Sequence, residues 1–496
     1  MVISVREMRV LEVNCIGLGI PLRMLMEAAG LHVARVVEEK LGGREGVEIA
    51  VMVGKGGNGG DGLVAARYLA SRGYRVYVLP AYDPGLISHP DAVANMEIVK
   101  RLDSVKVLKP GRYDVLGSVD VVIDGLLGTG VKGELREPIR SLVEEANKSS
   151  AYLKVAIDTP TGLNPDTGEV HGVVFKADVT VTFHDVKPGL LKRPDLVGEI
   201  VVANIGIPRE AWLYVGPGDV LHRVPRKPCN AHKGMGGRVL VVGGSRYYTG
   251  APALAGLAAL ACGADLSFVV VPEEVREVIA GYSPELITAT VPRDYFKPGD
   301  IELIEKYIKV FRPHVIVFGN GIGREPSTLE FAERFIKWVI EKGYYLVIDA
   351  DGLKGIVYGE TKLGWKVIIT PHRGEFKSLT NTSLSGDIDS DLEKIMNASN
   401  VLESTILLKA PVDIIVSGDK YRLNKTGNEA MTIGGTGDVL AGIAGAMLAK
   451  TGSPFEAAAV AAYLNGLAGD HIYYTIGCLL YTSPSPRDLS TSRMPS

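Results

Sequence analysis

The chain has 496 residues, of which 54 are Lys or Arg and 57 are Asp or Glu, giving a formal net charge of −3. This length exceeds what one hydrophobic core usually supports, so two or three domains are expected. The balanced charge argues against a partner held by bulk electrostatics, such as nucleic acid or an anionic membrane surface.

The four cysteines limit the class of protein further. They are Cys15, Cys229, Cys262 and Cys478, far apart and without a CxxC or Cys/His cluster. This spacing argues against a disulfide framework and a structural zinc site, and it fits a reducing compartment. No apolar signal core follows Met1, and the most apolar stretch, 251–264, is short for a membrane span. We therefore expect a soluble, cytoplasmic protein with no membrane partner.

The first half alternates short Val- and Ile-rich runs with amphipathic segments, which is typical of a parallel sheet covered by helices. Strands are predicted at 47–53, 75–79, 119–124, 153–158, 178–182 and 199–203. Helices are predicted at 21–41, 61–72, 90–102 and 136–147. Together these elements predict one doubly wound α/β sheet of six strands.

A glycine-rich loop follows the first predicted strand. Residues 54–62 (GKGGNGGDG) contain six glycines in nine positions, whereas a purely structural turn needs one or two. Such a loop exposes N–H groups at the carboxyl edge of a sheet, where open α/β folds bind phosphates and nucleotides. It has neither the Rossmann spacing nor the Walker lysine. The loop therefore indicates an anionic ligand, with a structural turn as the alternative.

Two further strand ends bring polar residues to the same edge. They are 124–130 (DGLLGTG) and 158–162 (DTPTG). The oxygen atoms of Asn58, Asp124 and Thr161 suit a monovalent or weakly held cation. Each aspartate has an alternative role as an acceptor of N–H bonds within its own turn.

The alternation lapses between about 205 and 232, where Gly, Pro and charged residues predict an interdomain connection. It then resumes. Strands are predicted at 238–242, 267–271, 286–291, 314–318, 345–349, 366–369, 405–408, 412–416 and 421–424. Helices are predicted at 251–263, 301–309, 328–341, 389–399 and 438–450. The second half is thus expected to form a separate α/β domain.

Near the C-terminus, residues 431–438 (MTIGGTGD) precede an apolar helix. Glycines in this run let backbone N–H groups approach an anion, and the positive end of the helix attracts negative charge. Asp438 can accept a proton from an attacking hydroxyl group. The run therefore indicates a phosphoryl-transfer site, and the alternative is a glycine-rich turn in which Asp438 only caps the helix.

The first half resembles the epimerase domain that acts on hydrated NADH and NADPH, known as the YjeF N-terminal domain, over about residues 6–208. The resemblance rests on 8–9 (MR), 25–30 (LMEAAG), 54–62, 124–134 (DGLLGTGVKGE), 158–162, 182–183 (TF) and 187–189 (KPG). It implies a Rossmann-like three-layer α/β/α fold. Gly57 and Ala28 stand where this family usually has asparagine.

That resemblance also implies roles for individual residues. The hydrated nucleotide would contact Gly57, Asn58, Gly59, Gly60, Asp61, Gly128, Thr129, Gly130, Val131, Lys132, Gly133, Glu134 and Asp158. Asn58, Asp124 and Thr161 would hold a potassium ion. Epimerisation needs a proton shuttle at the hydroxyl-bearing carbon, and Asp158 is the candidate.

The second half resembles the YjeF C-terminal domain, an ADP- or ATP-dependent NAD(P)H-hydrate dehydratase of ribokinase-like fold, from residue 232 to about 470. Its ordered motifs are 237–245, 248–263, 319–323 (GNGIG), 348–353 (IDADGL), 370–379 (TPHRGEFKSL), 408–413 (LKAPVD), 434–438 (GGTGD) and 461–470. The resemblance implies that the hydrated nucleotide contacts Ala253, Gly323, His372 and Asp438. The adenine nucleotide would contact Lys409, Ala410, Pro411, Val412, Asp413 and Gly437.

The implied chemistry explains these residues. Hydroxide leaves poorly, so the substrate hydroxyl must first be phosphorylated, with Asp438 as proton acceptor and a magnesium ion on the phosphates of ADP. His372 either contacts the ligand or is satisfied within its loop. Asp349 and Asp351 either touch magnesium through water or cap turns. Resemblance to two-domain microbial chains favours ADP over ATP.

We therefore hypothesise a bifunctional enzyme that epimerises the R and S forms of hydrated NADH and NADPH. It would dehydrate the S form with ADP, giving AMP and phosphate. The alternative is a ribokinase-like kinase for a small metabolite such as a vitamin precursor, with a non-catalytic nucleotide-binding N-terminal module. Only small-molecule substrates and other copies of the chain, in a homo-oligomer, are expected as partners.

The predicted boundaries are an epimerase domain at 1–210, a linker at 211–230 and a dehydratase domain at 231–476. Residues 477–496 do not continue the pattern, because ten of these twenty positions are Ser, Thr or Pro. This segment resembles translated sequencing-adapter sequence in place of the native end. A genuine disordered tail is the alternative.

Overall fold

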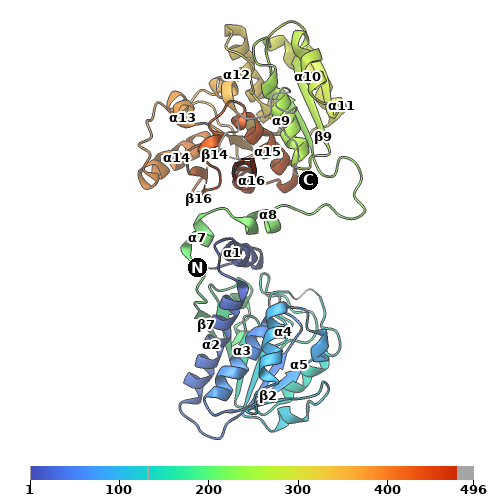
Figure 1. Cartoon of the computed structure of the whole chain (residues 1–496), viewed down its shortest axis with the longest axis vertical. Helices are drawn as coiled ribbons and strands as arrows, with labels where there is room; N and C mark the ends of the chain where they lie inside the picture. Colours follow the sequence, from blue (N-terminus) through green and yellow to red (C-terminus); the bar gives the residue numbers. More distant parts are fainter. Residues whose placement is uncertain (1, 131–132, 477–496) are drawn as a thin grey trace, which may run out of the picture. The chain divides into compact units, whose positions relative to one another are not determined.

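The computed structural model describes residues 2–130 and 133–476, which form two compact units, Met1–Ala211 and the chain from Trp212 onward. Each unit is an α/β fold around a single sheet, shown in blue to green and in green to red in Figure 1. The expected fold class, a Rossmann-like domain followed by a ribokinase-like domain, is confirmed. Among the described residues, no helix combines the length and apolar character needed to cross a membrane.

The first unit is built on a seven-stranded parallel sheet in the order β3-β2-β1-β4-β5-β6-β7. Its strands are β1 (Glu48–Val53), β2 (Arg75–Pro80), β3 (Val105–Val107), β4 (Val121–Gly125), β5 (Leu153–Ile157), β6 (Val179–Phe183) and β7 (Glu199–Ala203). The six predicted strands are present. We missed β3 because three residues are too few to show a pattern.

Helices cover both faces of this sheet. The helices of this unit are α1 (Val5–Gly17), α2 (Leu22–Leu41), α3 (Gly57–Ser71), α4 (Pro90–Val99), α5 (Ile139–Lys148) and α6 (Pro194–Val197), and α7 (Arg209–Leu213) follows β7. Helix α5 packs on the face that carries Ala50, Met52 and Val122. Helix α3 approaches Val51 and Val53 on the opposite face, and α2 and α4 pack beside it. Helix α1 was not predicted.

The second unit is built on a nine-stranded sheet in the order β10-β9-β8-β11-β12-β13-β14-β15-β16, antiparallel only at β14–β15 and β15–β16. Its strands are β8 (Arg238–Val242), β9 (Leu266–Pro272), β10 (Leu286–Val291), β11 (Val315–Phe318), β12 (Tyr345–Ile348), β13 (Val367–Ile369), β14 (Thr405–Leu408), β15 (Asp413–Ser417) and β16 (Lys420–Asn424). All nine were predicted within one residue or so of these bounds.

Its helices are α8 (Pro217–Arg223), α9 (Gly250–Ala261), α10 (Arg276–Tyr282), α11 (Ile301–Phe311), α12 (Pro326–Glu341), α13 (Arg373–Thr380), α14 (Ile388–Leu402), α15 (Thr436–Thr451) and α16 (Pro454–Ile476). Alternate residues of the central strands enter two cores. Val239 and Val241 face the core that contains residues of α9, α15 and α16. Leu240 and Val242 face the core built with α11, α12 and α14. Burial on both faces explains why these strands read as unbroken apolar runs.

The segment predicted as a linker, 211–230, has structure of its own. The Val215 N–H donates to the Leu423 carbonyl over 2.8 Å. Within α8, the fully buried Asp219 pairs with Arg223 at 2.7 Å and with Arg422 at 2.9 Å. A buried carboxylate without its cations would be strongly destabilising, so these pairs fix α8 on the second unit. The second unit therefore begins before the predicted boundary at 231.

Candidate active sites

Three loops meet at the carboxyl edge of the first sheet, because β1, β4 and β5 are neighbours there. The Gly54 N–H donates to the Gly125 carbonyl over 3.1 Å and joins the loops after β1 and β4. The Leu127 N–H donates to Thr161 Oγ1 over 3.0 Å and joins the loops after β4 and β5. The structure thus brings together the three strand ends singled out in the sequence.

The glycine-rich loop is partly helical, contrary to the predicted helix start at 61. Helix α3 begins at Gly57, so Gly57, Asn58, Gly59, Gly60 and Asp61 form its first turn. N–H groups in a first turn lack intrahelical acceptors and are available to an anion. A Cβ on Gly59 would lie 2.4 Å from the Gly54 carbonyl oxygen, and one on Gly60 would meet the Met26 side chain at 2.5 Å. Close packing therefore requires these glycines, and the helix end supplies the anion-binding character.

Two of the three predicted cation ligands, Asp124 and Thr161, are in direct contact, and the third, Asn58, lies in an adjoining loop. Thr161 Oγ1 donates to Asp124 Oδ1 over 2.8 Å, and the Thr161 N–H donates to Asp124 Oδ2 over 2.8 Å. Asn58 Oδ1 lies 3.1 Å from where a Cβ on Gly128 would stand, so the two loops are in contact. Burial raises the pKa of Asp124 to about 6, although the bonds from Thr161 and Leu126 oppose this. The oxygen donors and the single carboxylate fit a monovalent cation.

The remaining predicted contacts of this site follow β4. Gly128, Thr129, Gly130, Gly133 and Glu134 lie in an irregular segment between β4 and α5. Val131 and Lys132 lie outside the described residues.

Asp158 stands in a strained turn after β5. Its φ is +61°, and the Thr159 N–H donates to the Ile157 carbonyl over 2.7 Å, which closes a rare type of γ-turn around it. Asp158 Oδ1 pairs with Lys187 Nζ at 2.5 Å and also accepts from Thr182 Oγ1 at 3.2 Å. No bond from a described residue reaches Oδ2. Strained residues of this kind cluster at functional sites.

Two of the three charged residues around Asp158, Lys187 and Glu12, were missed as site residues. Lys187 is fully buried, and its ammonium also donates to Thr182 Oγ1 and the Phe183 carbonyl. Burial, and then the charge of Asp158, raises the pKa of Glu12 to about 7 and that of Asp61 well above the usual carboxyl range. Asp61 was predicted only as a ligand contact. Lys187 stood in the KPG motif without a role, and Glu12 belongs to the unpredicted α1.

The close approach at Gly54 gives a prediction for this site. A Cβ there would lie 1.9 Å from the Leu126 carbonyl oxygen, so Gly54→Ala must displace backbone and should cost about 1–3 kcal/mol. We expect a lower melting temperature and loss of epimerisation, with dehydration retained. Gly56→Ala is the matched control, because nothing lies within 4 Å of its added Cβ. Equal effects of the two substitutions would contradict this packing.

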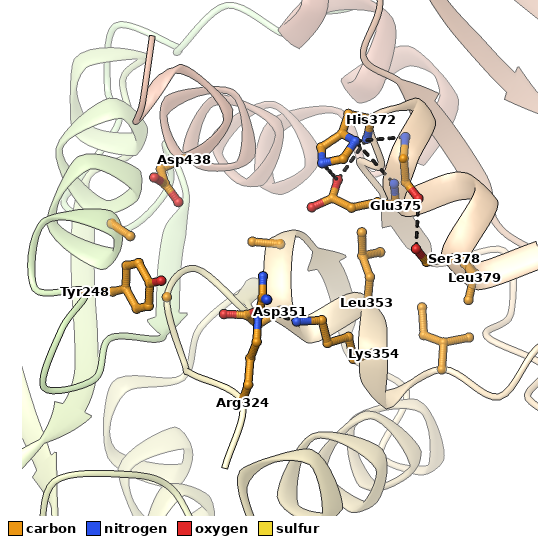
Figure 2. Close-up of a pocket in the computed structure, with 15 residues that line it drawn as sticks. Tyr248, Arg324, Asp351, Leu353, Lys354, His372, Glu375, Ser378, Leu379 and Asp438 are labelled. Carbon is orange, nitrogen blue, oxygen red and sulfur yellow. Dashed lines mark hydrogen bonds and ion pairs between the residues drawn. The ribbon is translucent and has the colours of Figure 1, made fainter. Parts of the chain in front are cut away.

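In the second unit, two cavities of about 700 and 780 Å³ share His372 in their linings. The first is lined by Asp438, Tyr248, Arg324, Asp351 and Lys354 among others, and Figure 2 shows Asp438 and Tyr248 across the cavity from His372. The second is lined by Lys409, Ala410, Pro411, Asp413 and Gly437 with residues of 426–432 and α16. Each volume is in the range of a small-molecule site. The predicted substrate and adenine-nucleotide residues thus lie mainly in different cavities.

Three predicted contacts lie outside these linings. Val412 packs against the core rather than into a cavity. Ala253 is buried within α9, 3% exposed. Gly323 has φ +91°, and a Cβ there would lie 2.5 Å from Glu325 Oε2. These three residues are therefore not among those that line the two cavities, and their contact with a ligand stays a prediction.

Asp438 lies in the first turn of α15, which begins at Thr436. Gly435 is the N-cap residue, so Asp438 is not the cap that the alternative interpretation required. Asp438 Oδ1 accepts from Asn320 Nδ2 over 2.7 Å, and no bond from a described residue reaches Oδ2. Burial raises the pKa of Asp438; the Asn320 bond opposes this rise and the charge of Asp349 adds to it. Asp438 therefore keeps one carboxylate oxygen without a bond from a described residue. It lies in the first turn of α15, where the N–H groups lack intrahelical acceptors.

Asp349 is fully engaged with protein groups. Its Oδ1 accepts from Thr370 Oγ1 and pairs with Lys409 Nζ, both at 2.7 Å, and its Oδ2 accepts from Asn320 Nδ2 at 3.2 Å. Burial disfavours the charged form of Lys409, but the charges of Asp349 and Glu375 raise its pKa overall. Asp351 pairs with Arg324 and Lys354. Within the described residues no cluster of three or more His, Cys, Asp or Glu side chains could hold a metal.

His372 is satisfied within its loop, which is one of the two interpretations left open by its sequence. It is the N-cap of α13, where Nδ1 accepts from the N–H groups of Gly374 at 3.0 Å and Glu375 at 3.2 Å. Its side chain is nevertheless 58% exposed and lines both cavities. Its ring is thus satisfied locally and is also accessible from both cavities, so the ligand contact stays a prediction.

Part of the second cavity was missed in the sequence. Asn465 and Gly466 of α16 line it, as does Asn428. Asp470 accepts from the Gly427 N–H and from Asn428 Nδ2, both over 2.9 Å, and so fixes this wall. The motif at 461–470 marked this region in the sequence, but no role was predicted for its residues.

The fold and the two sites define a two-domain α/β enzyme that handles nucleotides. The chain is 43% identical over 478 residues to the bifunctional NAD(P)H-hydrate repair enzyme Nnr of Hyperthermus butylicus, covering 94% of this chain and 87% of that protein. It belongs to the family of bifunctional NAD(P)H-hydrate repair enzymes.

Another relative, two family models and a solved structure are also similar to this chain. The Archaeoglobus fulgidus enzyme of the same description is 42% identical, covering 96% of this chain and 95% of that protein. Family models described as YjeF-related protein N-terminus and NAD(P)H-hydrate dehydratase match residues 22–189 and 239–485. A ribokinase-like superfamily protein from Enterococcus faecalis of known structure is 26% identical with a TM-score of 0.47, covering 53% of this chain and 89% of that one.

Proposed function

We propose that the chain repairs hydrated NADH and NADPH with two activities. The first unit interconverts the R and S forms, and the second dehydrates the S form with ADP, giving AMP and phosphate. One observation carries the second activity: the adjacent residues Gly437 and Asp438 line different cavities at the start of α15. A phosphoryl donor in one cavity and a hydroxyl group in the other would meet at this helix end.

In the dehydration, the oxygen of the substrate hydroxyl attacks the terminal phosphorus of ADP. Asp438 Oδ2 accepts the proton of that hydroxyl group. N–H groups of the first turn of α15 and the Lys409 ammonium offset the negative charge on the transferring group. AMP leaves with the bridging oxygen. The C–O bond of the phosphorylated intermediate then breaks, phosphate departs, and loss of a proton from the neighbouring ring carbon restores the dihydropyridine.

A magnesium ion would be held by the phosphates of ADP rather than directly by the carboxylates of this site. Both oxygens of Asp349 are used by Lys409, Thr370 and Asn320, and Asp351 is paired with two cations. These carboxylates do not offer an open pair of ligands, so no step of the mechanism is assigned to a protein-bound magnesium ion.

For epimerisation, Asp158 is the proposed proton shuttle, since one of its oxygens is held by Lys187 and Thr182 while Oδ2 has no partner among the described residues. Ring opening and reclosure at the hydroxyl-bearing carbon inverts its configuration. Gly57–Asp61 and the segment 128–134 would hold the nucleotide, as the close contact of Asn58 with Gly128 supports.

A potassium ion is proposed at Asn58, Asp124 and Thr161, where it would neutralise a buried carboxylate and join three loops. We expect the melting temperature of the full chain to fall when potassium is replaced by tetramethylammonium, because a ligand that binds only the folded state stabilises it. Asp124→Asn should abolish that difference. A melting temperature independent of the cation in the unsubstituted chain would contradict the site.

A repair assay tests the proposed function. The purified chain is incubated with hydrated NADH and ADP, and recovery of NADH absorbance and release of free phosphate are followed. We expect both, in a nucleotide-dependent manner. No recovery with either ADP or ATP would overturn the proposal. Release of a phosphorylated product in place of phosphate would favour a small-metabolite kinase.

A further inference from the structure

Asn320 is a buried amide between two carboxylates of the dehydratase site. It follows β11 in the segment 319–323 and is 0% exposed. Its Nδ2 donates to Asp438 Oδ1 over 2.7 Å and to Asp349 Oδ2 over 3.2 Å. Its carbonyl oxygen in the backbone accepts from the Gly244 N–H over 2.9 Å, which fixes the position of the residue.

The orientation of this amide follows from its neighbours. Ionised carboxylates only accept hydrogen bonds, so the side that faces both must be the NH₂ group. The reverse orientation would set the amide oxygen against two carboxylates. Asn320 Oδ1 has no hydrogen-bond partner among the described residues. The amide is therefore orientated by Asp349 and Asp438 rather than by bonds to its own oxygen.

The consequence concerns how Asp438 is presented. Because Asn320 engages Oδ1, the carboxylate is held with Oδ2 as the oxygen left for a ligand. The same amide ties Asp438 to Asp349, which is in turn fixed by Lys409 and Thr370. Hydrogen bonds and an ion pair thus connect Asp438, at the start of α15, to the Lys409 ammonium.

We propose that Asn320 is a positioning residue for dehydration, and that its amide bridge to Asp349 and Asp438 fixes the orientation of the catalytic carboxylate. The inference rests on the proposed function of the second unit. Asn320 itself touches no reacting atom. Its effect is expected in the turnover number and not in the binding of either nucleotide.

The charged groups around Asp438 predict a second effect of losing the Asn320 donor, on the pH dependence of dehydration. They are Asp349, at the end of β12, and Lys409, after β14, and both influence its ionisation together with the Asn320 bond. Removing a donor that favours the ionised form makes protonation of Asp438 easier. The acid side of the pH profile should then move to higher pH.

Asn320→Leu tests the proposal, since leucine is similar in volume and donates nothing. In the full chain, with hydrated NADH and ADP, we expect kcat of dehydration to fall by about 10- to 100-fold, the range for one bond to a charged group. The KM values for both substrates should stay within about twofold, and the pH of half-maximal kcat on the acid side should rise. Asn320→Asp should lose more, because it sets a third carboxylate beside two.

Thr328→Val is the matched control. Thr328 is 0% exposed in the same unit and donates to the Phe296 carbonyl, outside both cavity linings. It should lose stability without a change in the pH profile. The proposal is overturned if Asn320→Leu leaves kcat and the pH profile unchanged, or if it lowers activity equally at every pH with the same loss of melting temperature as the control. An inactive unsubstituted chain would instead overturn the proposed function.

Discussion

Asp438→Asn is expected to lower kcat of dehydration by about 10²- to 10⁴-fold, the usual contribution of a positioned general base. Asparagine keeps the shape of the side chain, and its amide oxygen can still accept from Asn320, which lies 2.7 Å from Asp438 Oδ1. Lys409 keeps its pair with Asp349. The substitution thus removes the proton acceptor while the neighbouring network persists. Nucleotide-dependent recovery of NADH absorbance measures the loss.

The same variant should epimerise at nearly the original rate, because the predicted epimerase residues all belong to the first unit. Asp391→Asn is the matched control. Asp391 is a buried carboxylate of the second unit, 1% exposed, that accepts from Ser385 and Gly386 and lines neither cavity. Its loss should affect stability more than turnover. Equal losses of dehydration and epimerisation in Asp438→Asn would count against two independent sites.

The strands were predictable because burial on both faces of a sheet requires a continuous run of apolar residues in each strand. Central strands such as Val239–Val242 must be apolar throughout, and such runs stand out from the amphipathic helices between them. The helix starts were less predictable. Helix α3 begins within a glycine-rich run, where intrinsic propensity argues against helix, and the glycines are required there by close packing against Met26 and Gly54.

Candidate site residues could be named from the sequence where they follow strands, and they were missed where their partners are remote. Asp124, Asp158 and Asp438 stand at strand ends or helix starts, which local pattern identifies. Asn320 gains its role only from Asp349 and Asp438, which are 29 and 118 residues away in the chain. Lys187 likewise needs Asp158, 29 residues away. The contacts of Asn320 depend on the topology that brings β11, β12 and α15 to one edge, and the pair of Lys187 with Asp158 depends on the neighbouring strands β5 and β6. No short motif encodes either arrangement.

Asp158→Asn is expected to lower the rate of epimerisation by about 10²- to 10⁴-fold while dehydration of the S form persists. Lys187 complicates the interpretation of a lost activity, because its ammonium is fully buried against Asp158 at 2.5 Å. Removing one partner of a buried pair costs about 3–5 kcal/mol, so a loss of activity alone would not distinguish chemistry from unfolding. A second variant separates these causes.

In Asp158→Asn/Lys187→Met the buried charge is removed together with its partner. Replacing both members of a buried pair by neutral groups is often nearly neutral for stability, so the melting temperature should recover relative to Asp158→Asn. Epimerisation, followed by chromatography of the two forms without nucleotide, should stay low in both variants because neither has a carboxylate at 158. If the double variant regained epimerisation along with stability, Asp158 would be a structural partner of Lys187 and the proton shuttle would have to be sought elsewhere. Glu12 and Asp61 would then be the residues to test, because burial and the charge of Asp158 raise the pKa of both carboxyl groups.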